Sequence, residues 1–199
     1  MVCQMPHSTR LRFIQLLPNA STSGDFILRD LPGSGKRIDV LCRVLSASFE
    51  WGPNTWNSSM ISVIAVIGDA AILQFHYPGE SLPSGERSWA QIIKDSLNDK
   101  PPDFVMVREG NLESVILEHN TPSENLWILH EDGEELNLQE VLNSTTDNSF
   151  MLGDHRGFNS QTGELVSKYS LRKISLGKTS YLSSHCVARI ISEFERMDK

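Results

Sequence analysis

Cysteine is scarce in this chain of 199 residues, and basic side chains are outnumbered by acidic ones. Cys3, Cys42 and Cys186 are unevenly spaced and form no Cys-x-x-Cys pair. This pattern argues against a disulfide framework or a zinc ribbon and favours a reducing compartment. With 18 Lys and Arg against 25 Asp and Glu, the formal net charge is −7. Binding to RNA would therefore need a local basic patch, because phosphate neutralisation supplies much of RNA affinity.

Long apolar runs are also missing. The most apolar stretch, residues 61–67, is far shorter than the ~20 residues that a membrane-spanning helix requires. Residues 1–17 make a poor signal peptide, since Arg10 and Arg12 are their only Lys or Arg and the apolar part is typical of a strand. We therefore expect a cytoplasmic protein with no membrane partner. Its length and its 39% hydrophobic content predict a single domain over residues 1–199.

Short apolar runs alternate with amphipathic stretches, which predicts an α/β fold with a mostly parallel sheet. The expected strands are Leu11–Leu17, Met60–Ile67, Ala71–His76, Phe104–Arg108, Leu126–His130, Ser149–Leu152 and Arg172–Leu176. The expected helices, each with apolar residues at helical spacing, are Arg37–Glu50, Glu86–Leu97 and Ser184–Met197. Ser183 stands where the N-cap of the last helix belongs.

Three strands near the C-terminus each run into a glycine-bearing turn. The turns are residues 131–133 (Glu-Asp-Gly), 153–155 (Gly-Asp-His) and 177–180 (Gly-Lys-Thr-Ser). Ligands of open α/β sheets bind beyond the carboxyl ends of strands, and glycine lets main chain approach a ligand closely. We therefore expect the three turns to line one pocket. Cys186, in the first turn of the last helix, is expected to face them with a pKa lowered by the helix N-terminus; simple core packing is the equal alternative.

Residues 31–36 (Leu-Pro-Gly-Ser-Gly-Lys) look like a phosphate-binding loop, but two positions disagree. Asp30 stands where the first glycine belongs, and Arg37 stands where Ser or Thr should follow the lysine. The alternative is a flexible loop that enters the helix of residues 37–50, whose N-terminus could still hold an anion.

Two further groups of charged residues are candidates for a metal site and for contacts with RNA. A metal site could be assembled from His130, Glu131, Asp132, Asp154, His155 and His185, but their spacing matches no known ligand pattern, and we expect no metal. The densest basic stretch consists of Arg29, Lys36, Arg37 and Arg43. Such residues usually just solvate a surface, but here they flank a Gly/Pro loop, so they are the candidates for contacts with RNA phosphates.

Five motifs, collinear over nearly the whole chain, resemble those of the tRNA pseudouridine-54 N1-methyltransferases. They are residues 22–26 (TSGDF), 30–40 (DLPGSGKRIDV), 129–133 (LHEDG), 152–158 (LGDHRGF) and 174–177 (ISLG), the last leading to His185-Cys186. Residues 60–122 carry little of this pattern. Five separated motifs are far more specific than any one of them.

The resemblance implies a SPOUT-type methyltransferase with a mostly parallel sheet, flanking helices and a C-terminal trefoil knot. It also implies a homodimer that binds S-adenosyl-L-methionine in a bent conformation inside the knot. The reaction implied is methylation of N1 of pseudouridine 54 in the T-arm of tRNA. Carried over by motif, the cofactor-binding residues would be Leu129, Gly153, Ser175, Leu176, Gly177 and Cys186.

N1 of pseudouridine carries a proton that a nearby carboxylate could remove. Asp25 and Asp39 lie in the N-terminal motifs, and we prefer Asp25 as the catalytic base because Gly24 should leave its surroundings open. Capping of a loop is the competing role for Asp25. Two other functions stay open: a non-catalytic module that binds RNA or senses S-adenosylmethionine, and a metal-dependent hydrolase that uses the His/Asp group.

Overall fold

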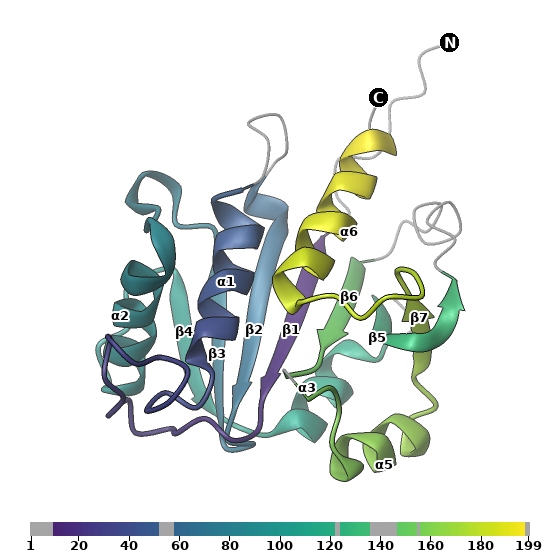
Figure 1. Cartoon of the computed structure of the whole chain (residues 1–199), viewed down its shortest axis with the longest axis horizontal. Coiled ribbons are helices and arrows are strands. Elements are labelled where there is room, and N and C mark those ends of the chain that lie inside the picture. Colours follow the sequence, from purple (N-terminus) through teal and green to yellow (C-terminus); the bar gives the residue numbers. More distant parts are fainter. Residues whose placement is uncertain (1–9, 52–57, 122–123, 136–146, 155, 198–199) are drawn as a thin grey trace.

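The computed structural model describes residues 10–51, 58–121, 124–135, 147–154 and 156–197, which build a mixed sheet in the order β4-β3-β2-β1-β6-β5-β7 (Figure 1). The neighbours β2, β1, β6, β5 and β7 pair in parallel, and β3 is antiparallel to both β2 and β4. The strands are β1 Leu11–Leu17, β2 Ile61–Ile67, β3 Ala71–His76, β4 Val105–Glu109, β5 Glu124–Glu135, β6 Asp147–Leu152 and β7 Arg172–Ser175. The helices are α1 Ile38–Phe49, α2 Gly85–Leu97, α3 Leu112–His119, α5 Ser160–Lys168 and α6 Ser183–Met197, with 3₁₀ turns at Ser58–Met60 and Gly79–Ser81.

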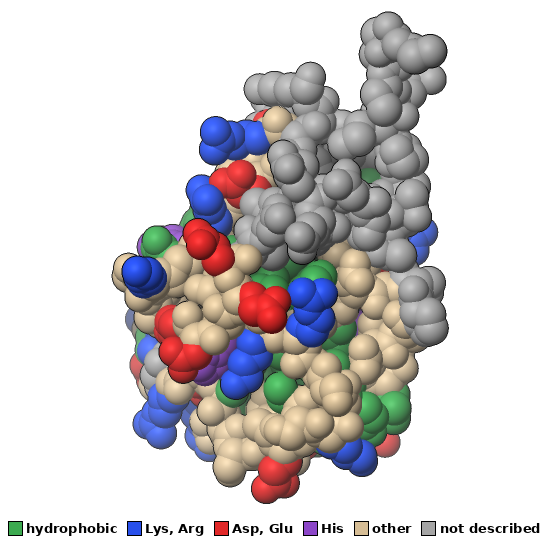
Figure 2. All heavy atoms as spheres, turned by 90° about the vertical axis from the view of Figure 1, so that its right-hand side faces the viewer, with side chains coloured by type: hydrophobic (Ala, Val, Ile, Leu, Met, Phe, Trp, Pro, Cys, Tyr) green, Lys and Arg blue, Asp and Glu red, His purple; other side chains and the backbone are tan. Residues whose placement is uncertain are grey.

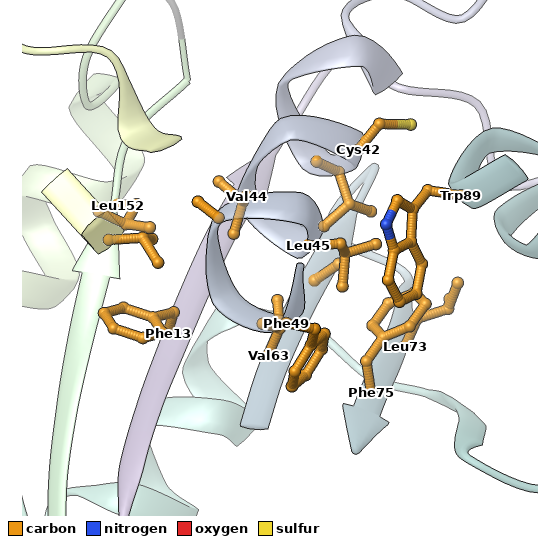
Figure 3. Close-up of a cluster of buried hydrophobic side chains, with 14 of the residues drawn as sticks. Phe13, Cys42, Val44, Leu45, Phe49, Val63, Leu73, Phe75, Trp89 and Leu152 are labelled. Atoms are coloured by element: carbon orange, nitrogen blue, oxygen red, sulfur yellow. The ribbon is translucent and has the colours of Figure 1, made fainter. Parts of the chain in front are cut away.

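Helices cover both faces of the sheet, and β1 shows how the chain divides between the two layers. Phe13 packs in the core beneath α1, α2 and α6, whereas Ile14 packs in the core beneath α3 and α5. Because both faces are buried, every residue of β1 and β2 is buried and apolar residues do not alternate with polar ones; Arg12, Gln15 and Ser62 are the polar residues of these strands. Figure 3 shows the first core, in which Leu45 and Phe49 of α1 lie between the strands and Trp89 of α2.

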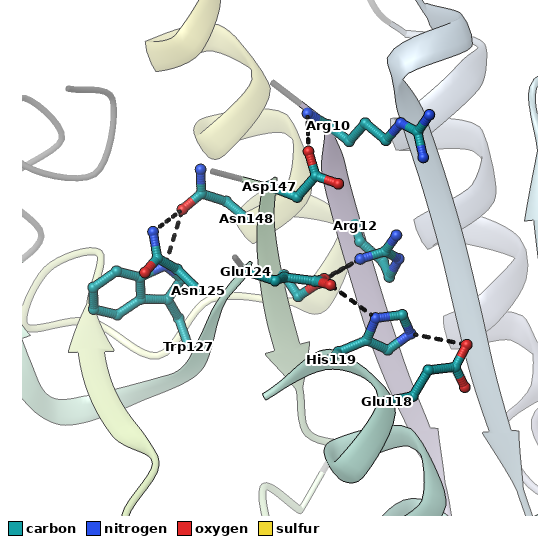
Figure 4. A network of polar contacts seen from close by, with 10 residues as sticks. Arg10, Arg12, Glu118, His119, Glu124, Asn125, Trp127, Asp147 and Asn148 are labelled. Atoms are coloured by element: carbon teal, nitrogen blue, oxygen red, sulfur yellow. Dashed lines mark hydrogen bonds and ion pairs between the residues drawn. The ribbon is translucent and has the colours of Figure 1, made fainter. Parts of the chain in front are cut away.

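A second, polar cluster lies at the amino ends of the strands (Figure 4). Glu124, at the start of β5, receives hydrogen bonds from Arg12 of β1 and Ser149 of β6. The Nδ1 atom of His119 at the end of α3 lies 3.1 Å from the other carboxylate oxygen. Burial alone would raise the pKa of Glu124, but the hydrogen bonds with His119 and Ser149 and the charge of Arg12 outweigh it and lower that pKa.

The seven expected strands and three expected helices are confirmed to within two residues, except that β5 continues five residues past its expected end at His130, and α3 and α5 were not predicted. Helix α3 has only eight residues, and its apolar side is rich in β-branched residues, as a strand would be. Helix α5 contains Gly163 and few apolar residues, so it lacks a clear helical stripe. The N-cap expected at Ser183 is wrong by one position, since Ser183 is the first helical residue. None of the described helices is long and apolar enough to cross a membrane.

Candidate functional site

A cavity of about 800 Å³ opens beside residues 129–131 of β5, at the carboxyl ends of β6 and β7, where α6 begins. The predicted turns after β6 and β7 contribute to its wall. The turn predicted at residues 131–133 is wrong, because β5 continues through these residues, and of the three only Glu131 lines the cavity. The six predicted cofactor-binding residues, Leu129, Gly153, Ser175, Leu176, Gly177 and Cys186, all line it. Their contact with a cofactor is still a prediction, but the fold brings together residues that span 58 positions of sequence between Leu129 and Cys186.

The turn after β6 is tight because Gly153 and Gly157 touch. Asp154 N–H donates to the Gly157 carbonyl at 3.2 Å, and Gly157 N–H donates back at 3.0 Å. A Cβ at position 153 would lie 2.8 Å from the Gly157 backbone, which is closer than real Cβ atoms come. Gly153 is therefore needed for the chain to fold back over the end of β6.

The turn after β7 is held by a side chain. Ser175 Oγ donates to the Gly177 carbonyl at 2.8 Å and accepts from Gly177 N–H at 3.1 Å. Gly177 has φ +140°, a conformation that L side chains rarely adopt. Beside it, β5 passes so close to β7 that a Cβ on Gly133 would lie 2.5 Å from the Ile174 backbone. These contacts bring the main chain of residues 175–177 to this wall of the cavity, next to the side chain of Tyr181.

Cys186 contradicts the expectation of a lowered pKa. Burial, reinforced by the charge of Glu131, raises the pKa of its thiol to about 11, although a backbone hydrogen bond acts in the other direction. The cost of burying a thiolate therefore exceeds the benefit of the helix N-terminus, and Cys186 is a neutral thiol at physiological pH.

The four predicted RNA-binding cations separate into two groups. Arg37 and Arg43 line the cavity, and both bind the carboxylate of Asp39, which is 1% exposed. The hydrogen bond to Asp39 raises the pKa of Arg37. Arg29 and Lys36 are exposed and lie outside the cavity lining. Among the described residues on the face at the β7 edge, acidic and basic side chains are interspersed (Figure 2), so this part of the face is not uniformly basic.

Asp25, the predicted catalytic base, does not line this cavity. It is exposed, and a hydrogen bond with Ser23 lowers its pKa, which makes it a weaker base. The expectation that Gly24 leaves open space is wrong, because a Cβ there would lie 2.5 Å from the Asn98 side chain. Gly24 is thus packed against α2. Asp39 is occupied by its two arginines.

In the loop of residues 31–36, which resembles a phosphate-binding loop, main-chain N–H groups bind the carboxylate of the preceding residue, Asp30. Asp30 accepts hydrogen bonds from Gly33 N–H at 3.1 Å and from Ser34 N–H at 2.8 Å. These main-chain donors are therefore already used. Across the described part of the chain, no group of three or more His, Cys, Asp or Glu could hold a metal ion. His155 lies outside the described residues.

Sequence reasoning missed several lining residues that adjoin the predicted ones. Arg156 comes from the turn after β6, and Tyr181 comes from the segment before α6; Asp154 belongs to the turn that was expected to line the pocket, but no role in cofactor binding was predicted for it. Asp154 is close enough to Arg37 for its charge to help raise the pKa of that arginine. Their adjacency to Gly153 and Cys186 was the available signal, but adjacency does not show which side chains point inward.

The sheet, with its cavity at the carboxyl ends of parallel strands, places the chain among α/β proteins that bind a ligand at that edge. The family described as "Putative SAM-dependent RNA methyltransferase" matches residues 11–198, and the chain belongs to that family. The family predicted from the motifs is thereby confirmed.

Individual relatives agree with this assignment. The tRNA (pseudouridine(54)-N(1))-methyltransferase of Methanococcoides burtonii is 30% identical over 195 residues, covering 92% of this chain and 95% of the relative. The protein of the same name from Thermococcus onnurineus is 31% identical over 193 residues, covering 89% and 93%. A crystal structure of Archaeoglobus fulgidus Nep1 bound to S-adenosylhomocysteine has a TM-score of 0.63 at 14% identity, covering 95% of this chain and 98% of that one. This last likeness concerns the fold alone.

Proposed function

We propose that this protein transfers the methyl group of S-adenosylmethionine to N1 of pseudouridine 54 in tRNA. The observation that carries the proposal is the assembly of the six motif residues, from strands β5 and β7, the turns after β6 and β7, and helix α6, around one cavity of about 800 Å³. Relatives at about 30% identity over most of both chains, which bear the name of that activity, support the choice of substrate.

The cavity fits S-adenosylmethionine in its chemistry. The ligand is positively charged at its sulfonium and amino groups, and the carboxylates of Glu131 and Asp154 line the cavity. A hydrogen bond with Ser180 lowers the pKa of Glu131 and favours its charged form. The hydroxyls of Ser175 and Thr179 and the main chain near Gly177 complete a polar wall. When bound, the ligand would supply an activated methyl group, and this wall would orient it.

The acceptor must lose its N1 proton, and two carboxylates are candidates for the base. Asp154 lines the cavity, and its charge helps raise the pKa of Arg37 there. Asp25 lies outside the cavity of its own chain, so it could act only from a second protomer. We therefore assign proton removal to Asp154 and keep Asp25 as the alternative.

For RNA contacts we propose Arg29, Lys36, Arg37 and Arg43. Arg37 and Arg43 lie at the cavity, where a phosphate next to the target base would pass, and the exposed Arg29 and Lys36 would hold phosphates farther away. Base flipping would bring the target base into the cavity.

We further propose that residues 1–199 form one SPOUT domain with a C-terminal trefoil knot, active as a cytoplasmic homodimer. The knot is supported by the path of β5, which continues past β6 until Glu135 pairs with Ser175, while the chain after β7 returns to place Ser183 against Gly153. The dimer is supported by exposed Tyr181 and Leu182 beside the cavity. Light scattering should give twice the chain mass of 22.3 kDa; a monomer at micromolar concentration would contradict the dimer.

The decisive experiment compares two tRNA transcripts that differ only in uridine or pseudouridine at position 54. We expect methylation of the pseudouridine transcript alone, measured by nucleoside mass spectrometry, because N1 of uridine is bonded to the sugar. Equal methylation of both would exclude N1 as the acceptor. Methylation of neither, by protein that binds S-adenosylhomocysteine, would favour the non-catalytic module. Loss of activity with a chelator would favour the metal-dependent alternative.

A further inference from the structure

Gln15 is an amide at the centre of an otherwise apolar part of β1. It is 0% exposed and stands between Ile14 and Leu16. Its Nε2 atom donates to the Leu16 carbonyl at 3.0 Å and to the Gly153 carbonyl at 2.9 Å. Its Oε1 atom is buried and finds no hydrogen-bond partner among the residues that the structure describes. A buried acceptor without a partner costs stability, so stability alone does not explain a glutamine at this position.

The position of Gln15 in the sheet explains what the amide does. The β1–β6 ladder ends at the pair Gln15–Leu152, and Gly153 is the first residue beyond it. The amide therefore takes the carbonyl just past the last strand pair, where the chain leaves the sheet. Ser183 Oγ, at the start of α6, donates to the same carbonyl at 3.2 Å. One acceptor thus joins β1, the turn after β6 and the first turn of α6.

We infer that Gln15 is a positioning residue for the cofactor cavity, an inference that rests on the proposed function. Gln15 does not line the cavity itself. It acts through the Gly153 carbonyl, which sets the distance between two cavity walls, the turn of residues 153–157 and the start of α6. The Gln15 amide thus leaves one buried acceptor without a partner, and its donor defines the shape of the cavity.

The test replaces Gln15 with leucine, which has a similar volume but no polar atoms. Because the change removes the unsatisfied acceptor together with the donor, we expect the melting temperature to stay constant or rise. The affinity for S-adenosylhomocysteine, measured by calorimetry, should fall about fivefold, the value of one hydrogen bond. In the methyl-transfer assay, the KM for S-adenosylmethionine should rise while kcat changes less.

Two further variants show whether the effect runs through the Gly153 carbonyl. Ser183→Ala removes the other donor, and the double variant Gln15→Leu/Ser183→Ala should lose more affinity than the product of the two single losses, because in each single variant the remaining donor still partly holds the carbonyl. Ser96→Ala is the matched control. Ser96 on α2 is also buried, its hydroxyl also has no partner among the described residues, and it does not line the cavity. The Ser96→Ala substitution should leave the affinity for S-adenosylhomocysteine unchanged.

The possible results separate this inference from the proposed function. If the unaltered protein binds S-adenosylhomocysteine and Gln15→Leu binds it within about twofold of that affinity, Gln15 has no positioning role. A Gln15→Leu variant that loses both melting temperature and affinity, matched by Ser96→Ala, would also reject it in favour of general core stability. Absence of binding by the unaltered protein would instead overturn the proposed function, and the role of Gln15 with it.

Discussion

Arg37 holds the Asp39 carboxylate with two hydrogen bonds, from Nε to Oδ1 at 2.9 Å and from Nη2 to Oδ2 at 3.0 Å. Arg43 adds a third, at 2.5 Å. Because Asp39 is 1% exposed, these hydrogen bonds and ion pairs replace the water that its carboxylate has lost. A residue predicted from the sequence as a phosphate contact therefore also neutralises a buried carboxylate, and this changes what its mutation should do.

Arg37→Ala should lower the free energy of unfolding by about 1–3 kcal/mol, since Asp39 loses two charged donors and keeps only Arg43. Lys36→Ala, which changes an exposed neighbour, should alter it by no more than about 0.5 kcal/mol. Urea denaturation measures both. Equal stability of the two variants would show that the Arg37–Asp39 pair does not matter for folding.

The Lys36→Ala variant also tests binding to tRNA. If all four proposed cations contact phosphates, log affinity against log salt should have a slope of about −3 to −4, and Lys36→Ala should reduce its magnitude by about one. The affinity for S-adenosylhomocysteine should not change in Lys36→Ala, because that side chain lies outside the cavity lining. A slope identical to that of the unaltered protein would remove Lys36 from the RNA interface.

Asp154→Asn should lower kcat by about 100-fold, because an amide cannot accept the N1 proton. Binding of S-adenosylhomocysteine should persist, as calorimetry would verify. Asp25→Asn is the comparison, and its kcat should stay within about threefold of the unaltered enzyme. The reverse pattern would make Asp25 the base and would require a second protomer to bring it to the cavity.

Gly153→Ala should weaken cofactor binding and lower stability, since its Cβ would meet the Gly157 backbone at 2.8 Å. Gly163→Ala is the matched control: it lies in α5, and a Cβ there meets nothing within 4 Å. That change should raise stability by about 0.5–1 kcal/mol, because alanine favours helix more than glycine does. Thermal melts and calorimetry on both variants check the contrast, and a tolerated Gly153→Ala would refute the steric argument.

The pH dependence of stability should reveal Glu124. Its pKa in the folded protein is lowered from the ordinary value of 4.5, so its contribution is present above that value and is lost as the pH falls through the lower, folded-state pKa. Glu124→Gln should therefore have a lower free energy of unfolding than the unaltered protein at pH 7, and the difference between the two free energies should become smaller in acid. Urea titrations between pH 7 and about pH 3 measure it. A gap independent of pH would mean that the Glu124 charge contributes nothing.

Alkylation should report the state of Cys186. With a pKa of about 11, its thiolate is rarer at neutral pH than that of an ordinary cysteine, so labelling by iodoacetamide should be slow and should accelerate with pH up to that value. S-adenosylhomocysteine should protect it, since Cys186 lines the cavity. Mass spectrometry of the peptide distinguishes Cys186 from the buried Cys42. Fast labelling at pH 7 would contradict the raised pKa.

Local patterns in the sequence predicted much of this fold, because strand and helix periods are read from neighbouring residues. The largely apolar runs of β1 and β2 predicted strands, and the stripe from Val187 to Phe194 predicted α6. The glycine turns that follow β6 and β7 predicted the cavity, since parallel strands present their carboxyl ends at one edge. The short helices α3 and α5 were not predicted, because tertiary packing stabilises them more than a helical apolar stripe does.

Only the tertiary structure decided the electrostatics and the contacts between distant segments. The Cys186 thiol has a raised pKa because burial outweighs the helix terminus, and burial depends on what packs around the helix. Gln15 and Gly153 are 138 positions apart, and their hydrogen bond exists because β1 and β6 are neighbours in the sheet. The sequence determined that a glutamine would interrupt an apolar strand. Strand order, set by global packing, determined which carbonyl that glutamine would hold.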